Sequence, residues 1–142
     1  MITTKFVNGT EIPSEARALT RGTIGSMQGL YDRERRHLVA TLIYDGSQLI
    51  GWCCARKVRK FFFLFFETYT DEVEIHTFIH SDHRQKGLGK RILKETLSKI
   101  HAMNPKVCVR YGAPQEDADF FNKTYKENIK ASGLEADRYF CA

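Results

Sequence analysis

The pattern of apolar and polar residues predicts short strands that are interspersed with helices. The strand-like runs are rich in β-branched and aromatic residues and are bounded by turn-forming residues. They cover residues 2–7, 37–44, 48–55, 72–80, 107–111 and 136–141. Asp45-Gly46-Ser47 separates the second run from the third. This turn predicts a β-hairpin, because Asp-Gly supplies the positive φ angles that a tight turn needs.

In three segments the apolar residues recur with the spacing of a helix. Ser14 is a suitable cap for the first, whose helical potential continues to about Arg36. The second runs from Gly87 to about Met103, and the third covers residues 117–131. The apolar residues of the second fall on one stripe: Leu88, Ile92, Leu93, Leu97 and Ile100. The order of elements predicts one α/β domain over residues 1–142, with a mixed, mostly antiparallel sheet flanked by helices on both faces.

One segment departs from simple alternation. Residues 56–60 are strongly basic, and residues 61–66 read Phe-Phe-Phe-Leu-Phe-Phe. We interpret the aromatic run as a strand buried on both faces, or as an interface with a protein partner or a second copy of the chain. Basic residues beside aromatic ones also occur in sites for single-stranded nucleic acid, but we do not expect that partner from this segment alone.

Charge and cysteine content limit the class of ligand and the cellular compartment that we expect. A net charge of +5 favours a polyanionic ligand, an acidic protein surface or nucleic acid, without choosing among them. The four cysteines form no Cys-x-x-Cys pair, so we expect reduced structural thiols and no metal. As neighbours in a strand, Cys53 and Cys54 should point to opposite faces. The start of the chain lacks the apolar core of a signal peptide, and the longest apolar run is too short to cross a bilayer, so we expect a cytoplasmic protein without a membrane anchor.

The most informative motif is Arg84-x-x-Gly87-x-Gly89, which lies between a predicted strand and a predicted helix. Unpaired backbone N–H groups at a helix start, two glycines and nearby cations together form an anion site. The spacing does not fit a P-loop, because Gly89-Lys90 is followed by Arg91 instead of Ser or Thr. A dinucleotide fingerprint fails as well, since Ile92 stands where its third glycine would be. The motif therefore predicts a phosphate-bearing ligand of another kind.

This motif, after its strand and before its helix, resembles the acetyl-CoA loop of the GNAT superfamily of N-acetyltransferases. The resemblance implies acetyl-CoA as the co-substrate, with its diphosphate on the backbone of the loop and of the first helical turn. Those residues are Arg84, Gln85, Lys86, Gly87, Leu88, Gly89 and Lys90. It also implies that the pantetheine arm pairs with the strand end at Phe78, Ile79 and His80, in a gap between this strand and the strand at 107–111. Asn122 is a candidate second contact with CoA.

The resemblance also implies the chemistry. An amine attacks the thioester, a base takes the proton of the amine, and an acid protonates the departing thiolate. The positions at which relatives place the base fall on Val73 and Ile75, which cannot act as one, so Glu74 is the preferred candidate and His76 the second. Tyr125 is the candidate acid, although its distance from Gly133 is longer than the family usually has.

Two hypotheses follow. The first is an N-acetyltransferase that moves an acetyl group from acetyl-CoA to an amine acceptor, which is a small molecule or a protein. The alternative is a catalytically weak or inactive protein of the same fold that acts by binding another protein. The absence of a base in the expected register favours the alternative, and the loop favours the first.

Overall fold

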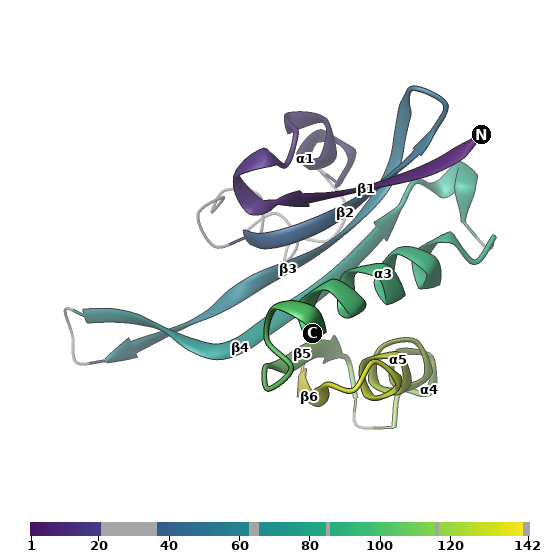
Figure 1. Cartoon of the computed structure of the whole chain (residues 1–142). Helices are drawn as coiled ribbons and strands as arrows, with labels where there is room; N and C mark the ends of the chain where they lie inside the picture. The colour runs from purple at the N-terminus through teal and green to yellow at the C-terminus, as the bar shows by residue number, and fades with distance from the viewer. Residues whose placement is uncertain (21–36, 63–65, 85, 116, 141–142) are drawn as a thin grey trace.

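The computed structural model describes residues 1–20, 37–62, 66–84, 86–115 and 117–140, with backbone only at residues 17, 20, 37, 59–62 and 66–71. One six-stranded sheet organises the chain (Figure 1), in the order β1 (Ile2–Asn8), β2 (His37–Asp45), β3 (Gln48–Phe62), β4 (Phe66–Ile79), β5 (Cys108–Ala113) and β6 (Glu135–Phe140). The pairs from β1 to β4 are antiparallel, whereas β4–β5 and β5–β6 are parallel. The predicted mixed, mostly antiparallel sheet is confirmed.

Helices lie on both faces of the sheet, as predicted. Helix α3 (Leu88–Met103) crosses one face in Figure 1 and buries its predicted stripe, including Ile92 and Leu97, against the sheet. Helix α1 (Ser14–Thr20) follows the short 3₁₀ turn η1 (Gly9–Glu11) and packs on the opposite face, where Ala16 joins a cluster around Trp52. Removing such apolar side chains from water is the main stabilising contribution to the fold. The helical potential predicted beyond Thr20, up to Arg36, lies outside the described residues.

The hairpin between β2 and β3 is confirmed. Gly46 has a φ of 62°, the left-handed conformation that favours glycine, in the turn that the Asp-Gly pair predicted. The prediction for the two neighbouring cysteines also holds. Cys53 belongs to the cluster under α3, and Cys54 to the cluster under α1. Both thiols are free and buried.

The two central strands are longer than predicted. β3 continues past Ala55 to Phe62, and β4 begins at Phe66 instead of Glu72. The added residues pair with each other, as in Phe62↔Phe66, and form a two-stranded ribbon that extends away from the helices in Figure 1. A run of six apolar residues has no alternation from which the strand ends could be read. The side chains of this run lie outside the described part, so its predicted burial or role as an interface stays a prediction.

β4 and β5 separate soon after they meet. Their parallel pairing covers Glu72↔Cys108, Val73↔Val109 and Glu74↔Arg110, while β4 continues to Ile79 and β5 to Ala113. The predicted divergence of these two strands is therefore present, and it leaves the last part of β4 with a neighbour on one side only. The predicted end of this strand at Tyr111 is wrong. β5 continues through Gly112, which pairs with Tyr139 of β6. A Cβ on Gly112 would lie only 3.1 Å from Cζ of Tyr139, so the ring packs closely over this glycine.

The last predicted helix is divided into three parts. These are α4 (Asp119–Phe121), the π-helical turn η4 (Asn122–Lys126) and α5 (Glu127–Ala131). In η4 the Glu127 N–H donates to the carbonyl of Asn122, five residues back, which is the bonding of a π-helix. Single π turns within helices are frequent at functional sites. Within the ranges that the structure describes, no helix is both long enough and apolar enough to span a bilayer.

Candidate active site

Arg84 and residues 86–90 lie at a bend that opens helix α3. The 3₁₀ turn η3 (Ser81–His83) follows β4, and Gly87 has a φ of 73°, a conformation that side chains disfavour. The first helical hydrogen bond runs from Arg91 N–H to the carbonyl of Gly87, at 3.1 Å. By the geometry of a helix, the N–H groups of the three residues at 88–90 therefore have no partner within the helix. They point outward at the positive end of the helix dipole.

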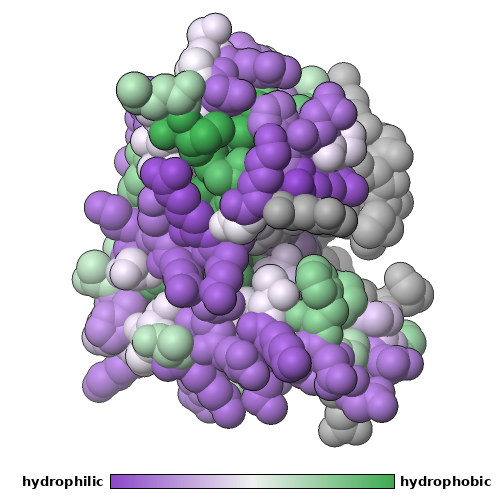
Figure 2. All heavy atoms as spheres, turned by 90° about the vertical axis from the view of Figure 1, so that its right-hand side faces the viewer, coloured by the Kyte–Doolittle hydropathy of each residue, from purple (hydrophilic) through white to green (hydrophobic). Residues whose placement is uncertain are grey.

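Gly89 brings this helix start against the end of β4. A Cβ on Gly89 would lie 3.6 Å from Cγ1 of Ile79 and 3.7 Å from Cγ2 of Thr77, which is ordinary van der Waals contact. Lys86 and Lys90 are exposed beside the bend, and Gln85 lies outside the described residues. Figure 2 looks at this end of the molecule, where the outline is indented between an upper and a lower part and hydrophilic residues predominate. The bend and the strand end thus lie together, as the sequence predicted.

The free edge of β4 carries the backbone groups of Thr77 and Ile79. His80 N–H donates to the carbonyl of Ile50 in β3 at 2.7 Å. Backbone groups of alternate residues point to opposite edges of a strand, so those of Ile79 and Thr77 point away from β3, into the gap. The backbone groups of Phe78 and His80, which were also predicted to pair with the arm, point to β3 instead. The side chain of Arg84 turns back to this edge, and its Nε–H donates to the carbonyl of Ile79 at 2.9 Å. Its guanidinium also lies over the ring of Phe78, 5.6 Å from the centroid.

Tyr125 reaches the same part of β4 from the π turn. Its ring is stacked between Tyr111, with centroids 6.0 Å apart, and Phe121, at 6.5 Å. Burial raises the pKa of Tyr125 to about 12, and hydrogen bonding to the side chain and backbone of Thr77 opposes that rise in part. The phenol therefore holds its proton at neutral pH. Asn122 lies one turn earlier, and its Oδ1 accepts a hydrogen bond from the Tyr111 hydroxyl at 2.8 Å.

Alternate residues of β4 face opposite sides of the sheet, and this decides which can do chemistry. Val73 and Ile75 are buried under α3, as the register predicted. Glu74 and His76 lie on the other face, with 12% and 18% of their side chains exposed. His76 is the first residue of that face beyond the last pair with β5, so it lies where the gap opens.

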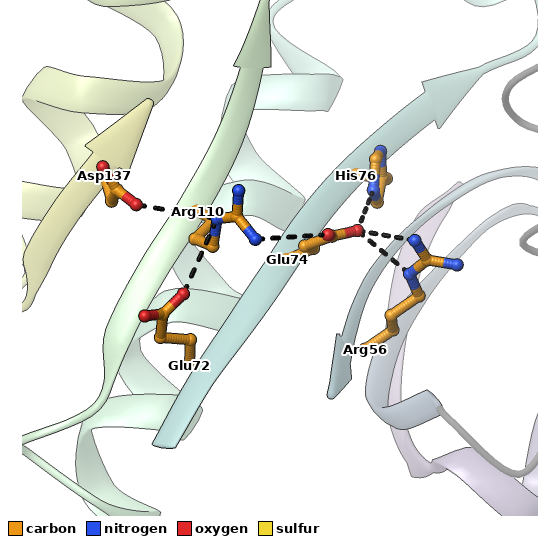
Figure 3. Close-up of polar contacts among 6 residues, drawn as sticks. All are labelled: Arg56, Glu72, Glu74, His76, Arg110 and Asp137. Carbon is orange, nitrogen blue, oxygen red and sulfur yellow. Dashed lines mark hydrogen bonds and ion pairs between the residues drawn. The ribbon is translucent and has the colours of Figure 1, made fainter. Parts of the chain in front are cut away.

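Glu74 is held by arginines from both neighbouring strands (Figure 3). Arg56 of β3 donates to Oε2 of Glu74 through Nη2 at 2.7 Å and Nε at 3.0 Å, and Nη1 of Arg110 in β5 lies 3.9 Å from Oε1. Burial alone would raise the pKa of this carboxyl, but His76 and Arg56 outweigh burial and hold the pKa at about 2. Nε2 of His76 lies 3.7 Å from Oε2 of Glu74, which is too long for a hydrogen bond.

Arg110 extends these contacts across the sheet. Its Nε lies 3.6 Å from a carboxylate oxygen of Glu72 and 3.6 Å from one of Asp137 on β6, and its guanidinium is 5.1 Å from the centroid of the Tyr139 ring. Sequence reasoning did not identify Arg56, Arg110 or Thr77 as part of this site. The two arginines meet Glu74 through cross-strand register, for which the sequence has no local signal.

The arrangement combines three kinds of group around one gap. There are backbone N–H groups at a helix start for an anion, a strand edge for an amide-bearing chain, and a protonated phenol opposite an imidazole across the sheet. Together they can hold an elongated phosphate ester and move protons at its far end.

Comparisons with known proteins agree with this geometry. The protein-family model described as "Acetyltransferase (GNAT) family" matches residues 11–107. No curated protein sequence matches the chain. A GNAT family acetyltransferase from Streptococcus pneumoniae TIGR4 has a similar structure, with a TM-score of 0.58 and 21% identity over 87% of this chain and 85% of that one.

Two further solved structures share the fold. One is a ribosomal-protein-alanine N-acetyltransferase from Brucella melitensis biovar Abortus 2308, with a TM-score of 0.53 and 16% identity over 87% of this chain and 89% of that one. The other is the aminoglycoside N-acetyltransferase AAC(6')-Iy in complex with CoA, with a TM-score of 0.52 and 16% identity over 100% of this chain and 93% of that one.

Proposed function

The chain belongs to the GNAT acetyltransferase family, and from this premise we propose that it transfers an acetyl group from acetyl-CoA to an amine by direct attack. The observation that carries the proposal is the free edge of β4, which leads from the Tyr125 hydroxyl to the glycine bend at the start of α3. A similarly folded aminoglycoside N-acetyltransferase has been solved in complex with CoA, which supports the choice of ligand.

The residues of the bend fit the ends of this co-substrate. The N–H groups of Leu88, Gly89 and Lys90 would bind the diphosphate, with Lys86 as a nearby cation. The backbone groups of Thr77 and Ile79 would pair with the amides of the pantetheine arm, as a strand edge pairs with an added strand. Gly89 keeps side-chain atoms out of the space beside these two residues. Asn122 is a weaker candidate contact, because Tyr111 already donates to its side-chain oxygen.

Tyr125 fits the role of the acid. When bound, acetyl-CoA supplies an acetyl group activated as a thioester. As the amine nitrogen bonds to the acetyl carbon and the carbon–sulfur bond breaks, the Tyr125 hydroxyl would give its proton to the sulfur. A phenol that stays protonated at neutral pH, beside Thr77 on the free edge, is suited to this step.

For the base, the contacts favour His76 over Glu74. A carboxylate whose pKa is about 2, and which Arg56 grips through two nitrogens, is a poor proton acceptor at neutral pH. Nε2 of His76 is buried and makes no hydrogen bond. We therefore assign His76 the role of taking the ammonium proton, with the carboxylate of Glu74 as its charged neighbour at 3.7 Å.

The test begins with the melting temperature of the wild-type protein in acetyl-CoA, followed by release of free CoA with a panel of amines. Binding to the folded state should raise the melting temperature by mass action. Gly89→Val should abolish this shift, because its methyl groups would fill the space beside Thr77 and Ile79. Ser98→Val, an exposed position later in α3, is the matched control for a β-branched residue in a helix and should keep the shift.

The outcomes separate the two hypotheses. A thermal shift together with CoA release supports the transferase. A shift without release on any amine supports the alternative, a protein that keeps the CoA site and acts by binding another protein. No shift in the wild-type protein would remove CoA from the proposal.

A further inference from the structure

Arg84 occupies a backbone acceptor that the proposed function assigns to the co-substrate. Its Nε–H donates to the carbonyl of Ile79 at 2.9 Å, on the edge of β4 that faces the gap. Resting on the proposed function, we infer that Arg84 exchanges partners: it covers Ile79 in the free protein and turns to the diphosphate when CoA binds. Arg84 is thus a positioning residue that links the two ends of the binding site.

The direction of the Ile79 carbonyl is the first step of the argument. The hydrogen bond from His80 N–H to Ile50 fixes which residues of β4 bond to β3, and Ile79 is not among them. β5 cannot take this carbonyl, because its pairing with β4 ends at Glu74↔Arg110. An arm that adds to this edge as a strand would need this oxygen for its own amide N–H.

The second step is the placement of the guanidinium. It lies over the face of Phe78, 5.6 Å from the ring centroid, so this exposed side chain lies across the end of the strand. Arg84 is also the first residue of the bend whose backbone leads to Gly87 and the start of α3. The inferred exchange requires only the side chain of Arg84 to turn from a carbonyl on the strand to an anion at the helix.

The third step compares the two partners. A hydrogen bond between a guanidinium and a phosphate joins two opposite charges, whereas one between a guanidinium and a carbonyl has only one charged partner. The carbonyl of Ile79 is neutral. A ligand with phosphates therefore draws Arg84 away from Ile79 and frees the oxygen for its own arm. A ligand without phosphates has to compete with Arg84 for that oxygen. One side chain thereby couples the affinities for the two parts of the ligand.

The experiment compares CoA with pantetheine, which lacks the phosphates, on the wild type and on Arg84→Ala. CoA affinity is measured by calorimetry, and pantetheine affinity by competition against CoA. We expect Arg84→Ala to weaken CoA binding by about tenfold or more, since a charged hydrogen bond is lost. We expect the same variant to bind pantetheine more tightly, by a few-fold and up to about tenfold, since the competitor for Ile79 is gone.

Two further variants are matched controls. Lys86→Ala removes an exposed cation from the same bend without uncovering Ile79, so it should weaken CoA modestly and leave pantetheine unchanged. Arg84→Gln keeps a donor but no charge. It should lose CoA affinity without a gain for pantetheine, and it replaces the alanine variant if that one does not fold.

The opposite changes for the two ligands are the signature of the exchange. Equal losses of both ligands in Arg84→Ala would show that Arg84 only orders the bend, and unchanged affinity for both would show that it has no part in binding. Either result overturns this inference while CoA binding by the wild type upholds the proposed function. Failure of the wild type to bind CoA overturns both.

Discussion

The two faces of β4 contrast sharply, although they alternate residue by residue along one strand. On the face under α3, Val73 and Ile75 are buried in an apolar cluster. On the opposite face, Glu74 and His76 lie among charged groups from β3 and β5. Because the side-chain period of a strand is two, the same backbone fixes both environments. Register, more than residue type, therefore decides which side chains of this strand pack in the core and which lie among charged groups.

Thr77 is the exception on the apolar face. It follows the point where β5 separates from β4, and both its side chain and its backbone interact with Tyr125. Its Oγ1 also donates to Sγ of Cys53 at 3.4 Å. A polar residue on the buried face thus stands at the position where the strand loses its pairing with β5.

The largest effects on stability and on activity should come from substituting one residue on each face of β4. Ile75→Ala removes a side chain that is 2% exposed, and we expect the free energy of unfolding to fall by about 2–5 kcal/mol in urea denaturation. His76→Gln, the adjacent position, should leave stability nearly unchanged and slow acetyl transfer by about a hundredfold. Comparable losses of stability in both variants would contradict the division of labour between the faces.

Lowering the pH should reduce the contribution of the charged face of β4 to the free energy of unfolding. The pKa of Glu74 is 4.5 in its ordinary state and about 2 in the folded protein. Its contribution is therefore complete above about pH 4.5 and is lost as the pH falls towards 2, and it amounts to about 3 kcal/mol at most. Unfolding free energies measured between pH 2 and 7 should show this loss in the wild type, whereas Glu74→Gln should depend less on pH. If the unfolding free energies of the wild type and of Glu74→Gln changed in parallel with pH, Glu74 would not be the source of the loss.

The smallest effect concerns Tyr125. A thiolate is already a good leaving group, so the loss of its proton donor should slow transfer by only about tenfold in Tyr125→Phe. CoA affinity should stay within about twofold, because the ring and its stacking on Tyr111 and Phe121 are retained. Steady-state rates and calorimetry on the same preparation measure both quantities. A fully active Tyr125→Phe would exclude the hydroxyl from proton transfer.

Features that depend on neighbours in the sequence could be predicted from it. Asp45-Gly46 gave the hairpin, and the stripe of α3 gave the helix and its buried face, since both are local signals of turn chemistry and period. The glycine bend between β4 and α3 is local for the same reason. Its position against Ile79 follows from the short connection.

Features that depend on pairing between distant segments could not be predicted. Glu74 was the preferred base from the sequence alone. Its contacts with Arg56 and Arg110, which make it a poor base, form only when three strands are in register, and the sequence does not show that register. The extension of β3 to Phe62 was missed, since an unbroken aromatic run has no period. The π turn was missed as well, because a single hydrogen bond to the carbonyl five residues back does not change the pattern of apolar residues in a recognisable way.

That wide turn has a consequence for how the aromatic stack is maintained. A π turn accommodates one more residue than an α turn, so the deletion of one residue between Asn122 and Lys126 would let the segment relax into an ordinary helix. The shorter helix would have ordinary α-helical bonding, and because a π turn absorbs its additional residue, the side chains before and after the deletion would keep nearly their present relative orientation. With Lys123 or Thr124 deleted, Phe121 and Tyr125 would stand three residues apart in an α-helix and still lie on one side of it, so we expect the aromatic stack to tolerate a segment that is one residue shorter.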